Sequence, residues 1–199
     1  LLNLLKEEAL GFVLPQGGGA TQKIRTLDYR EYFPAFITKG IDFQVLDREL
    51  ASFDLARLAT ALKPERDRQF QFLGLQTLYD RYFLHHEGTR FELPQAFFMR
   101  VAMGLALREI DREARAIEFY ELLSSFDFMC STPTLFNAGT LRPQLSSCFL
   151  TTVSDDLDGI FKAIKDNALL SKYAGGLGND WSSVRGLGAF SPGPTIVAL

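Results

Sequence analysis

The chain has 199 residues, of which 47% are hydrophobic and 23% are charged, and its formal net charge is −3. These values are typical of a globular protein with a sizeable core, and they exclude a disordered or fibrous chain. The small negative charge also excludes a strong bulk attraction to a nucleic-acid backbone or an anionic membrane. Any nucleotide must therefore be bound at a local site.

The first 143 residues are predicted to be mainly helical. An apolar opening run gives way to a glycine-rich linker before residue 25, and short apolar patches follow. Apolar side chains then recur at helical spacing, which predicts helices over residues 46–62, 65–84 and 95–108 and another that ends at Phe126. Pro94 is expected to occupy the first turn of the third helix, where its missing N–H does no harm.

The last third of the chain has a different character. Residues 131–143 are rich in Ser, Thr, Pro, Asn and Gly, which favour turns. Residues 145–153 predict a short buried strand, and Asp155 is expected to cap the helix that follows. A glycine loop at 174–178 and a second strand at 181–184 complete a strand–helix–strand order. This order indicates the start of an α/β domain.

Four local features could carry chemistry, and each also has a purely structural explanation. Cys148 is a candidate redox thiol or a small buried hydrophobe. The hydroxyls at 131–134 could bind a phosphate or a ribose, or they could belong to an ordinary capping turn. The glycines at 174–178 could let the backbone approach a phosphate, or simply end a helix. Asp155 and Arg185 could bind a ribose hydroxyl and a phosphate, or act as a helix cap and a solvated charge.

Several kinds of site and segment are not expected. Two cysteines, Cys130 and Cys148, are too few for a secreted disulfide scaffold, so a reducing cytoplasm is predicted. His85 and His86 are adjacent and would point to different faces of a helix, and no C-x-x-C or H-x-x-x-H pair occurs, so no metal site is predicted. The apolar runs are too short for a signal peptide or a membrane span.

Five segments of the last third occur in a distinctive order. They are STPTLFNAGT at 131–140, QLSSCFL at 144–150, DDLDGI at 155–160, AGGLG at 174–178 and VRGLG at 184–188. The series resembles the large subunit of ribonucleotide reductase, and it is most similar to the class I type. Upstream, FLGLQTLYDRY at 72–82 and ELPQ at 92–95 resemble the helical domain of the same family.

The resemblance implies a mainly α N-terminal domain followed by the first strand–helix–strand unit of a ten-stranded α/β barrel. We expect an N-terminal segment and linker at 1–24, a helical domain at 25–143 and the incomplete start of the barrel domain at 144–199. The family's radical cysteine, the partner of Cys148 and the C-terminal thiols would lie beyond residue 199. The chain is therefore expected to be an N-terminal fragment that is inactive alone, and an activity-regulating domain would be absent or reduced to residues 1–14.

The activity that the resemblance implies is a thiol-dependent radical reduction of ribonucleoside diphosphates to deoxyribonucleotides, under allosteric nucleotide control. This reaction serves deoxyribonucleotide biosynthesis and DNA replication. Two alternatives stay open. The chain could be a non-catalytic nucleotide-binding or dimerisation fragment of such a subunit, or it could belong to the cobalamin-dependent branch of the family.

The resemblance also implies roles for individual residues. Cys148 matches a redox-active thiol that forms a disulfide in each turnover. Thr132 and Ser147 match positions that bind the substrate, and Gly176 lies in a glycine loop near it. The effector-binding residues that it implies are Asp155, Asp156, Leu157 and Arg185.

The partners implied by the resemblance are nucleotides and proteins. The nucleotides are the ribonucleotide substrate and the effectors, which are deoxynucleoside triphosphates or ATP. The proteins are a metal-containing small subunit that supplies the radical, thioredoxin or glutaredoxin, and a second copy of the subunit that makes contact through the helix at 156–173. No cofactor or metal held by this chain, no membrane and no nucleic acid is expected.

Overall fold

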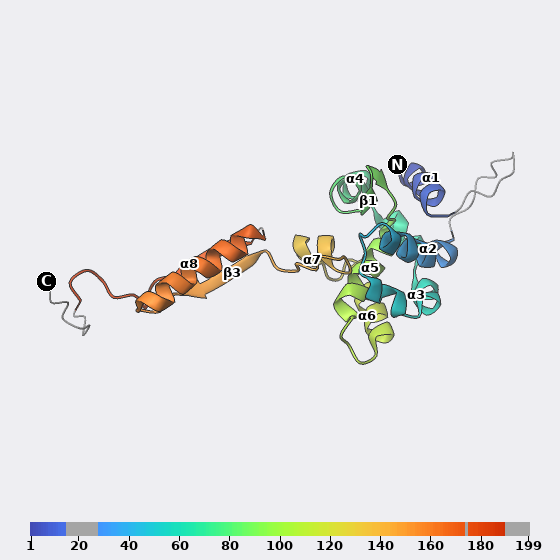
Figure 1. Cartoon of the computed structure of the whole chain (residues 1–199). Coiled ribbons are helices and arrows are strands. Elements are labelled where there is room, and N and C mark those ends of the chain that lie inside the picture. Colours follow the sequence, from blue (N-terminus) through green and yellow to red (C-terminus); the bar gives the residue numbers. More distant parts are fainter. Residues whose placement is uncertain (15–27, 174, 190–199) are drawn as a thin grey trace. The chain divides into compact units, whose positions relative to one another are not determined.

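The computed structural model describes residues 1–14, 28–173 and 175–189, and the chain divides into two units (Figure 1). The first unit is Leu1–Leu145 and the second is Ser146–Leu199. The glycine-rich linker predicted before residue 25 lies mostly outside the described residues. No helix of the described residues is both long enough and apolar enough to cross a membrane.

The first unit is built from helices, as the sequence predicts. A small antiparallel hairpin of β1 (His85–His86) and β2 (Thr89–Arg90) connects two of them. The helices, with η for a 3-10 helix, are α1 (Leu2–Val13), α2 (Tyr29–Asp42), η1 (Arg48–Ser52), α3 (Leu55–Ala61), η2 (Pro64–Gln69), α4 (Phe72–Arg81), α5 (Pro94–Ala106), α6 (Arg112–Ser124) and α7 (Thr132–Asn137).

Helix α5 is the centre of the first unit. Every residue from Pro94 to Met103 is buried, and a helix that is covered all round belongs to a core. Helices α2, α6, α7 and η2 all contact it. The prediction of a helix that begins with a proline in its first turn is confirmed, because Pro94 is the first residue of α5.

A buried ion pair joins α5 to α7. Arg100 and Glu92 are both fully buried, and Arg100 Nε donates to Glu92 Oε1 over 2.7 Å. The guanidinium also donates to the carbonyl oxygens of Leu135 at 3.1 Å and Ala138 at 2.7 Å. Glu92 Oε2 accepts from the backbone N–H of Leu84 at 2.9 Å. The pair therefore binds the end of α7, where carbonyl groups lack helical partners.

Two glycines allow the backbone beyond α7 to approach α5. A Cβ at Gly104 would lie 2.2 Å from the backbone nitrogen of Gly139 and 2.6 Å from the carbonyl carbon of Ala138. No side chain fits in that space. Gly139 has a φ of +75°, a left-handed conformation that glycine adopts without strain. The segment after α7 is thus held against α5 at backbone distance.

A second buried polar group ties four elements together. Asp67 is 2% exposed, and its carboxylate accepts from Tyr29 Oη at 3.1 Å and from Gln95 Nε2 at 2.8 Å. Lys6 Nζ lies 3.0 Å from the same carboxylate. Burial, and then the charge of Asp67, raise the pKa of Tyr29 well above its ordinary value. These contacts join α1, α2, η2 and α5.

The structure differs from the sequence-based prediction in three segments of this unit. Residues 46–62 form η1 and α3 instead of one helix, because the Asp54 side chain accepts from Arg57 N–H and starts a new helix. Residues 65–84 are likewise divided into η2 and α4. Phe70 lies between them and packs its ring against Phe126, with centroids 5.2 Å apart. The turn-rich segment at 131–143 contains the short helix α7.

The sequence predicts only a set of apolar patches where helix α2 lies. Its buried residues recur at helical spacing, but Pro34 lies inside the helix and obscures the pattern. The side chain of Asp28 accepts from Arg30 N–H at 2.9 Å and caps the helix.

The second unit has the predicted strand–helix–strand order. It contains β3 (Cys148–Thr152), α8 (Leu157–Lys172) and β4 (Gly176–Asp180). The two strands are parallel, with Cys148 opposite Gly176 and Thr152 opposite Asp180. Figure 1 shows α8 lying along β3. The described residues of this unit form an open two-stranded sheet and not a closed barrel.

The second strand begins earlier than predicted. Residues 176–178 are strand residues and not a loop, and the predicted strand at 181–184 is a turn in which Val184 N–H donates to Trp181 O. The reason lies at the end of α8. Gly175 N–H donates to Leu170 O over 3.0 Å, so the chain reverses at once and starts the strand at Gly176.

Strand β3 is not the buried strand that was predicted. Its exposure alternates along the chain, and Leu150 is 91% exposed. Phe149 lies on the side that packs near the end of α8, whereas Cys148 and Leu150 lie on the opposite, open side. Among the described residues, α8 covers one face of the sheet only.

We predict that Glu92→Gln strongly destabilises the first unit. Both carboxylate oxygens of Glu92 accept hydrogen bonds, one from Leu84 N–H and one from Arg100 Nε. In either orientation, the NH2 group of the glutamine side chain would face one of these donors and could not accept from it. The buried Arg100 also loses its counter-charge. The free energy of unfolding should fall by roughly 3–5 kcal/mol, measured by urea unfolding followed by circular dichroism.

The matched control is Glu49→Gln. Glu49 pairs with Arg108 at 3.0 Å, but both side chains are exposed. Its loss should cost less than about 1 kcal/mol. Equal losses in the two variants would contradict a special role for the buried pair.

Candidate functional site

The candidate residues of the first unit lie on α7. Thr132 is the first residue of this helix and is exposed. Ser131 Oγ lies 3.3 Å from Thr134 Oγ1, and Thr134 Oγ1 donates to Leu145 O over 3.2 Å. The hydroxyls of Ser131 and Thr134 are therefore engaged within the segment itself.

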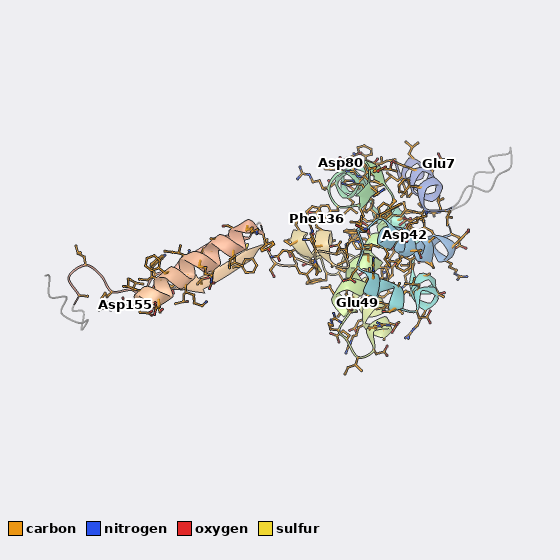
Figure 2. The ribbon with its side chains drawn as sticks, viewed as in Figure 1. Glu7, Asp42, Glu49, Asp80, Phe136 and Asp155 are labelled. Carbon is orange, nitrogen blue, oxygen red and sulfur yellow. The ribbon has the colours of Figure 1, made fainter. Side chains whose placement is uncertain are left out.

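The hydroxyl of Thr132 has a different partner. Its Oγ1 lies 3.2 Å from Tyr82 Oη, at the end of α4. The Tyr82 ring stacks on that of Phe136, with centroids 4.7 Å apart and an interplanar angle of 13°. Phe136 lies on α7 (Figure 2). Helix α4 thus contacts α7 both through a hydrogen bond and through an aromatic stack.

The second unit brings Ser147, Cys148 and Gly176 together. Cys148 is the exposed first residue of β3, and its Sγ lies 3.7 Å from Ser147 Oγ. Gly176 N–H donates to Ser147 O over 2.5 Å. A Cβ at Gly176 would lie 3.8 Å from Cys148 Sγ, so the glycine leaves that side of the thiol uncovered. Thr132, the fourth predicted substrate and redox residue, belongs to the first unit.

The other cysteine has a contrasting environment. Cys130 is partly buried and packs against the core of the first unit. Burial raises the pKa of its thiol, because desolvation disfavours the thiolate. Since the thiolate is the reactive form, Cys130 is the less suitable of the two for redox chemistry.

The predicted effector residues form one cluster in the second unit. Arg185 Nε donates to Asp155 Oδ2 over 2.7 Å, and the backbone N–H of Arg185 donates to Asp155 Oδ1 at 3.2 Å. Asp155 lies where β3 leads into α8 (Figure 2). The ion pair therefore ties this loop, which leads into Asp156 and Leu157, to the segment that follows β4.

The helix cap is Asp156 and not Asp155, which corrects the sequence-based prediction. Asp156 Oδ1 accepts from Gly159 N–H over 2.7 Å, so α8 begins at Leu157. The Ser154 hydroxyl, and then the Gly159 N–H, lower the pKa of Asp156 from its ordinary value of 3.8. Asp155 is unavailable as a cap because its carboxylate accepts from Arg185.

An apolar stripe runs along the exposed side of α8. Leu157, Phe161 and Ile164 are 73%, 66% and 51% exposed, and their spacing places them on one face of the helix. An exposed apolar stripe of this kind is typical of a protein–protein contact. Among the described residues, no group of His, Cys, Asp or Glu side chains could hold a metal ion.

Two sequence models of one protein family match this chain in order. The model described as "Ribonucleotide reductase, all-alpha domain" matches residues 68–143, and that described as "Ribonucleotide reductase, barrel domain" matches residues 146–194. The chain belongs to the ribonucleotide reductase large-subunit family. Its first unit carries the family's helical domain, and its second unit carries the start of the barrel domain.

Curated members of this family are similar to most of the chain. The ribonucleoside-diphosphate reductase subunit alpha of Chlamydia trachomatis is 54% identical over 83% of this chain, and that of Helicobacter pylori is 48% identical over 82%. The large subunit of Danio rerio is 45% identical over 77%. The chain spans only 16%, 21% and 19% of the length of these relatives, respectively.

Three residues that hold α7 are not predicted from the sequence as functional. They are Tyr82, Glu92 and Arg100. A signal for one of them was present, because Arg100 interrupts an otherwise apolar helix and a charge in that position requires a buried partner. Glu92 also belongs to the segment at 92–95 that resembles the ribonucleotide reductase family, but nothing in the sequence connects it with α7.

We predict that Asp156→Ala loosens the first turn of α8 in a pH-dependent way. The folded pKa of Asp156 is lowered, so its carboxylate stabilises the helix at neutral pH, and this stabilisation is lost as the pH falls below 3.8 and through the folded pKa. Hydrogen exchange in the first turn should be faster in the variant than in the parent at pH 7. The difference should vanish in acid.

Asp158→Ala is the control, because Asp158 lies in the same turn but is not the cap. It should accelerate exchange less than Asp156→Ala does. A difference between Asp156→Ala and the parent that persists unchanged in strong acid would rule out the carboxylate as its cause.

Proposed function

We propose that this chain is part of the large subunit of a ribonucleoside-diphosphate reductase. The observation that carries the proposal is the exposed thiol of Cys148, which is held at the start of β3 beside Ser147 and opposite Gly176. The relatives named above are ribonucleoside-diphosphate reductases, which supports the same activity here. We assign residues 25–143 to the helical domain and 144–199 to the start of the barrel domain.

The proposed reaction replaces the 2′-hydroxyl of a ribonucleotide with hydrogen. Two thiols lose two hydrogens and form a disulfide, and the hydroxyl leaves as water. Cys148 would be one of these two thiols. A strand residue is suited to this task, because the paired backbone fixes the position of Sγ while the open face of the sheet leaves it accessible.

The residues proposed to bind the substrate are Thr132, Ser147 and Gly176. Thr132 and Ser147 each offer an exposed hydroxyl, which can donate to a phosphate or ribose oxygen. Gly176 contributes in another way. Its N–H is already given to Ser147 O, so its role is to leave space beside the thiol and not to donate to the ligand.

The effector nucleotide would be bound by the cluster at Asp155, Asp156, Leu157 and Arg185. A guanidinium binds phosphate through parallel hydrogen bonds, and a carboxylate accepts from ribose hydroxyls. The exposed apolar stripe of α8 would make contact with a second copy of the subunit, as the sequence analysis predicts. The effectors would be deoxynucleoside triphosphates or ATP.

Other proteins would supply the remaining chemistry. The chain has two cysteines, and burial raises the pKa of the Cys130 thiol, which makes it a poor candidate for the partner of Cys148. The second redox thiol would therefore come from elsewhere in the large subunit. A metal-containing small subunit would deliver the radical, and thioredoxin or glutaredoxin would reduce the disulfide.

A second candidate function is a non-catalytic nucleotide-binding or dimerisation fragment. It is favoured by the Asp155–Arg185 pair and by the exposed apolar stripe of α8, which offer a nucleotide site and a contact surface that need no redox chemistry. The intact mass of the natural product distinguishes the two candidates. A product of the length of the relatives supports the enzyme, and a product of about this chain's length supports the fragment.

We predict that Cys148→Ser abolishes multiple turnover in the full-length large subunit. The serine hydroxyl cannot form a disulfide, so turnover with the small subunit and thioredoxin should fall roughly 10⁴-fold while the fold is retained. Cys130→Ser is the control and should turn over normally. Normal turnover in Cys148→Ser would refute the redox role.

We also predict that Arg185→Ala weakens the binding of deoxynucleoside triphosphates. A charged hydrogen bond to a phosphate contributes about 1.5–3 kcal/mol, so the dissociation constant should rise roughly 10- to 100-fold in a binding titration of the full-length subunit. Arg108→Ala removes another exposed arginine that pairs with a carboxylate, and it should leave the affinity unchanged. Equal affinities in Arg185→Ala and the parent would place the effector elsewhere.

A further inference from the structure

The three hydroxyls at the start of α7 are not equivalent. Thr134 Oγ1 donates its hydrogen to Leu145 O, so it must accept from Ser131 Oγ. The hydrogens of Ser131 and Thr134 are therefore both used inside the segment. The hydroxyl of Thr132 lies outside this chain of hydrogen bonds, and Tyr82 Oη is its neighbour at 3.2 Å.

The chemistry of the two oxygens decides the direction of the Tyr82–Thr132 hydrogen bond. A phenol is a stronger donor than an aliphatic alcohol, so Tyr82 donates and Thr132 Oγ1 accepts. The hydrogen of the Thr132 hydroxyl then points away from Tyr82. Because Thr132 is exposed, this hydrogen is free to meet an acceptor from solution.

The phenol oxygen of Tyr82 is held in place by its ring. The ring stacks on Phe136 and meets the ring of Phe97 edge-on, with centroids 6.3 Å apart. Phe97 is fully buried in α5. The side chain therefore has little rotational freedom, and the position of its hydroxyl oxygen is set by the contacts of the ring with Phe97 and Phe136.

The far end of α7 is fixed independently. Arg100 donates to the carbonyl oxygens of Leu135 and Ala138, at the other end of the helix from Thr132. The helix is thus held at both ends by different elements. A hydroxyl on a segment restrained in this way pays little entropy when it binds a ligand.

We propose that Tyr82 is a positioning residue that directs the Thr132 hydroxyl hydrogen towards an oxygen of the nucleoside diphosphate substrate. The proposal rests on the substrate role proposed above for Thr132. Tyr82 itself would not touch the substrate. By donating to a lone pair of Thr132 Oγ1, it would leave the hydrogen of that hydroxyl facing the ligand.

The test is Tyr82→Phe in the full-length large subunit, assayed with its small subunit. The variant keeps the ring and its stacking, and it removes only the hydroxyl. The KM for the ribonucleoside diphosphate should rise about three- to tenfold, the effect of one neutral hydrogen bond, with kcat unchanged. Tyr79→Phe is the matched control. Tyr79 lies one turn earlier on α4, its hydroxyl bonds to Glu8 instead, and its loss should leave the KM unchanged.

A double-mutant cycle with Thr132→Val separates positioning from a structural effect. In the Thr132→Val background, Tyr82→Phe should raise the KM no further, because the hydroxyl that it directs is gone. Thr132→Ser, which keeps the hydroxyl, should retain its dependence on Tyr82. Additive effects of Tyr82→Phe and Thr132→Val would overturn the proposal.

The remaining outcomes distinguish the positioning role of Tyr82 from the substrate role of Thr132. If Thr132→Val raises the KM and Tyr82→Phe does not, the positioning role is wrong and the substrate role of Thr132 stands. If neither variant changes the KM, the substrate role of Thr132 is itself wrong. Melting temperatures of all variants, measured in parallel, should lie close to that of the parent.

Discussion

The first unit depends on one buried charge, that of Arg100. Burying an ion costs several kcal/mol unless its partners replace water, and here Glu92 supplies the opposite charge while three carbonyl oxygens accept from the guanidinium. The carbonyls belong to the end of α7 and to the residue after it. The same charge that requires compensation therefore fixes the segment that carries Thr132. Gly104 makes the arrangement possible, because it lets that segment reach α5.

The second unit solves the placement of its reactive group differently. Strand pairing sets Cys148 opposite Gly176, and the alternation of the strand directs the thiol away from α8. Two hydrogen-bonded loops complete the unit. Asp156 starts α8, and Asp155 binds Arg185. The contacts of Asp155 and Asp156 lie at the ends of elements, whereas the Arg100–Glu92 pair is buried in the core of the first unit.

The sequence predicts well whatever depends on neighbouring residues. The apolar pattern and Pro94 predict α5, and the order of strand, helix and strand follows from the residues after 144. It fails where distant partners decide. Asp155 and Asp156 are equally good caps by sequence, and only Arg185, 30 residues away, determines which one serves. The glycines at 176–178 were assigned to a loop because glycine favours turns, yet strand pairing with β3 makes them a strand. The sequence likewise offers three hydroxyls near residue 132. Only the contacts with Tyr82 and Leu145 show that Thr132 is the one outside the hydrogen bonds of Ser131 and Thr134.

The pairing of Asp155 with Arg185 has a consequence for any anion that approaches this arginine. The carboxylate already acts as a tethered anion at the guanidinium, so binding is an exchange of one negative group for another and not the capture of a bare cation. A singly charged ligand gains little from such an exchange. A polyphosphate, with several charged oxygens, can outcompete the carboxylate and still bind other donors. The pair therefore favours ligands with several negative charges over ligands with one.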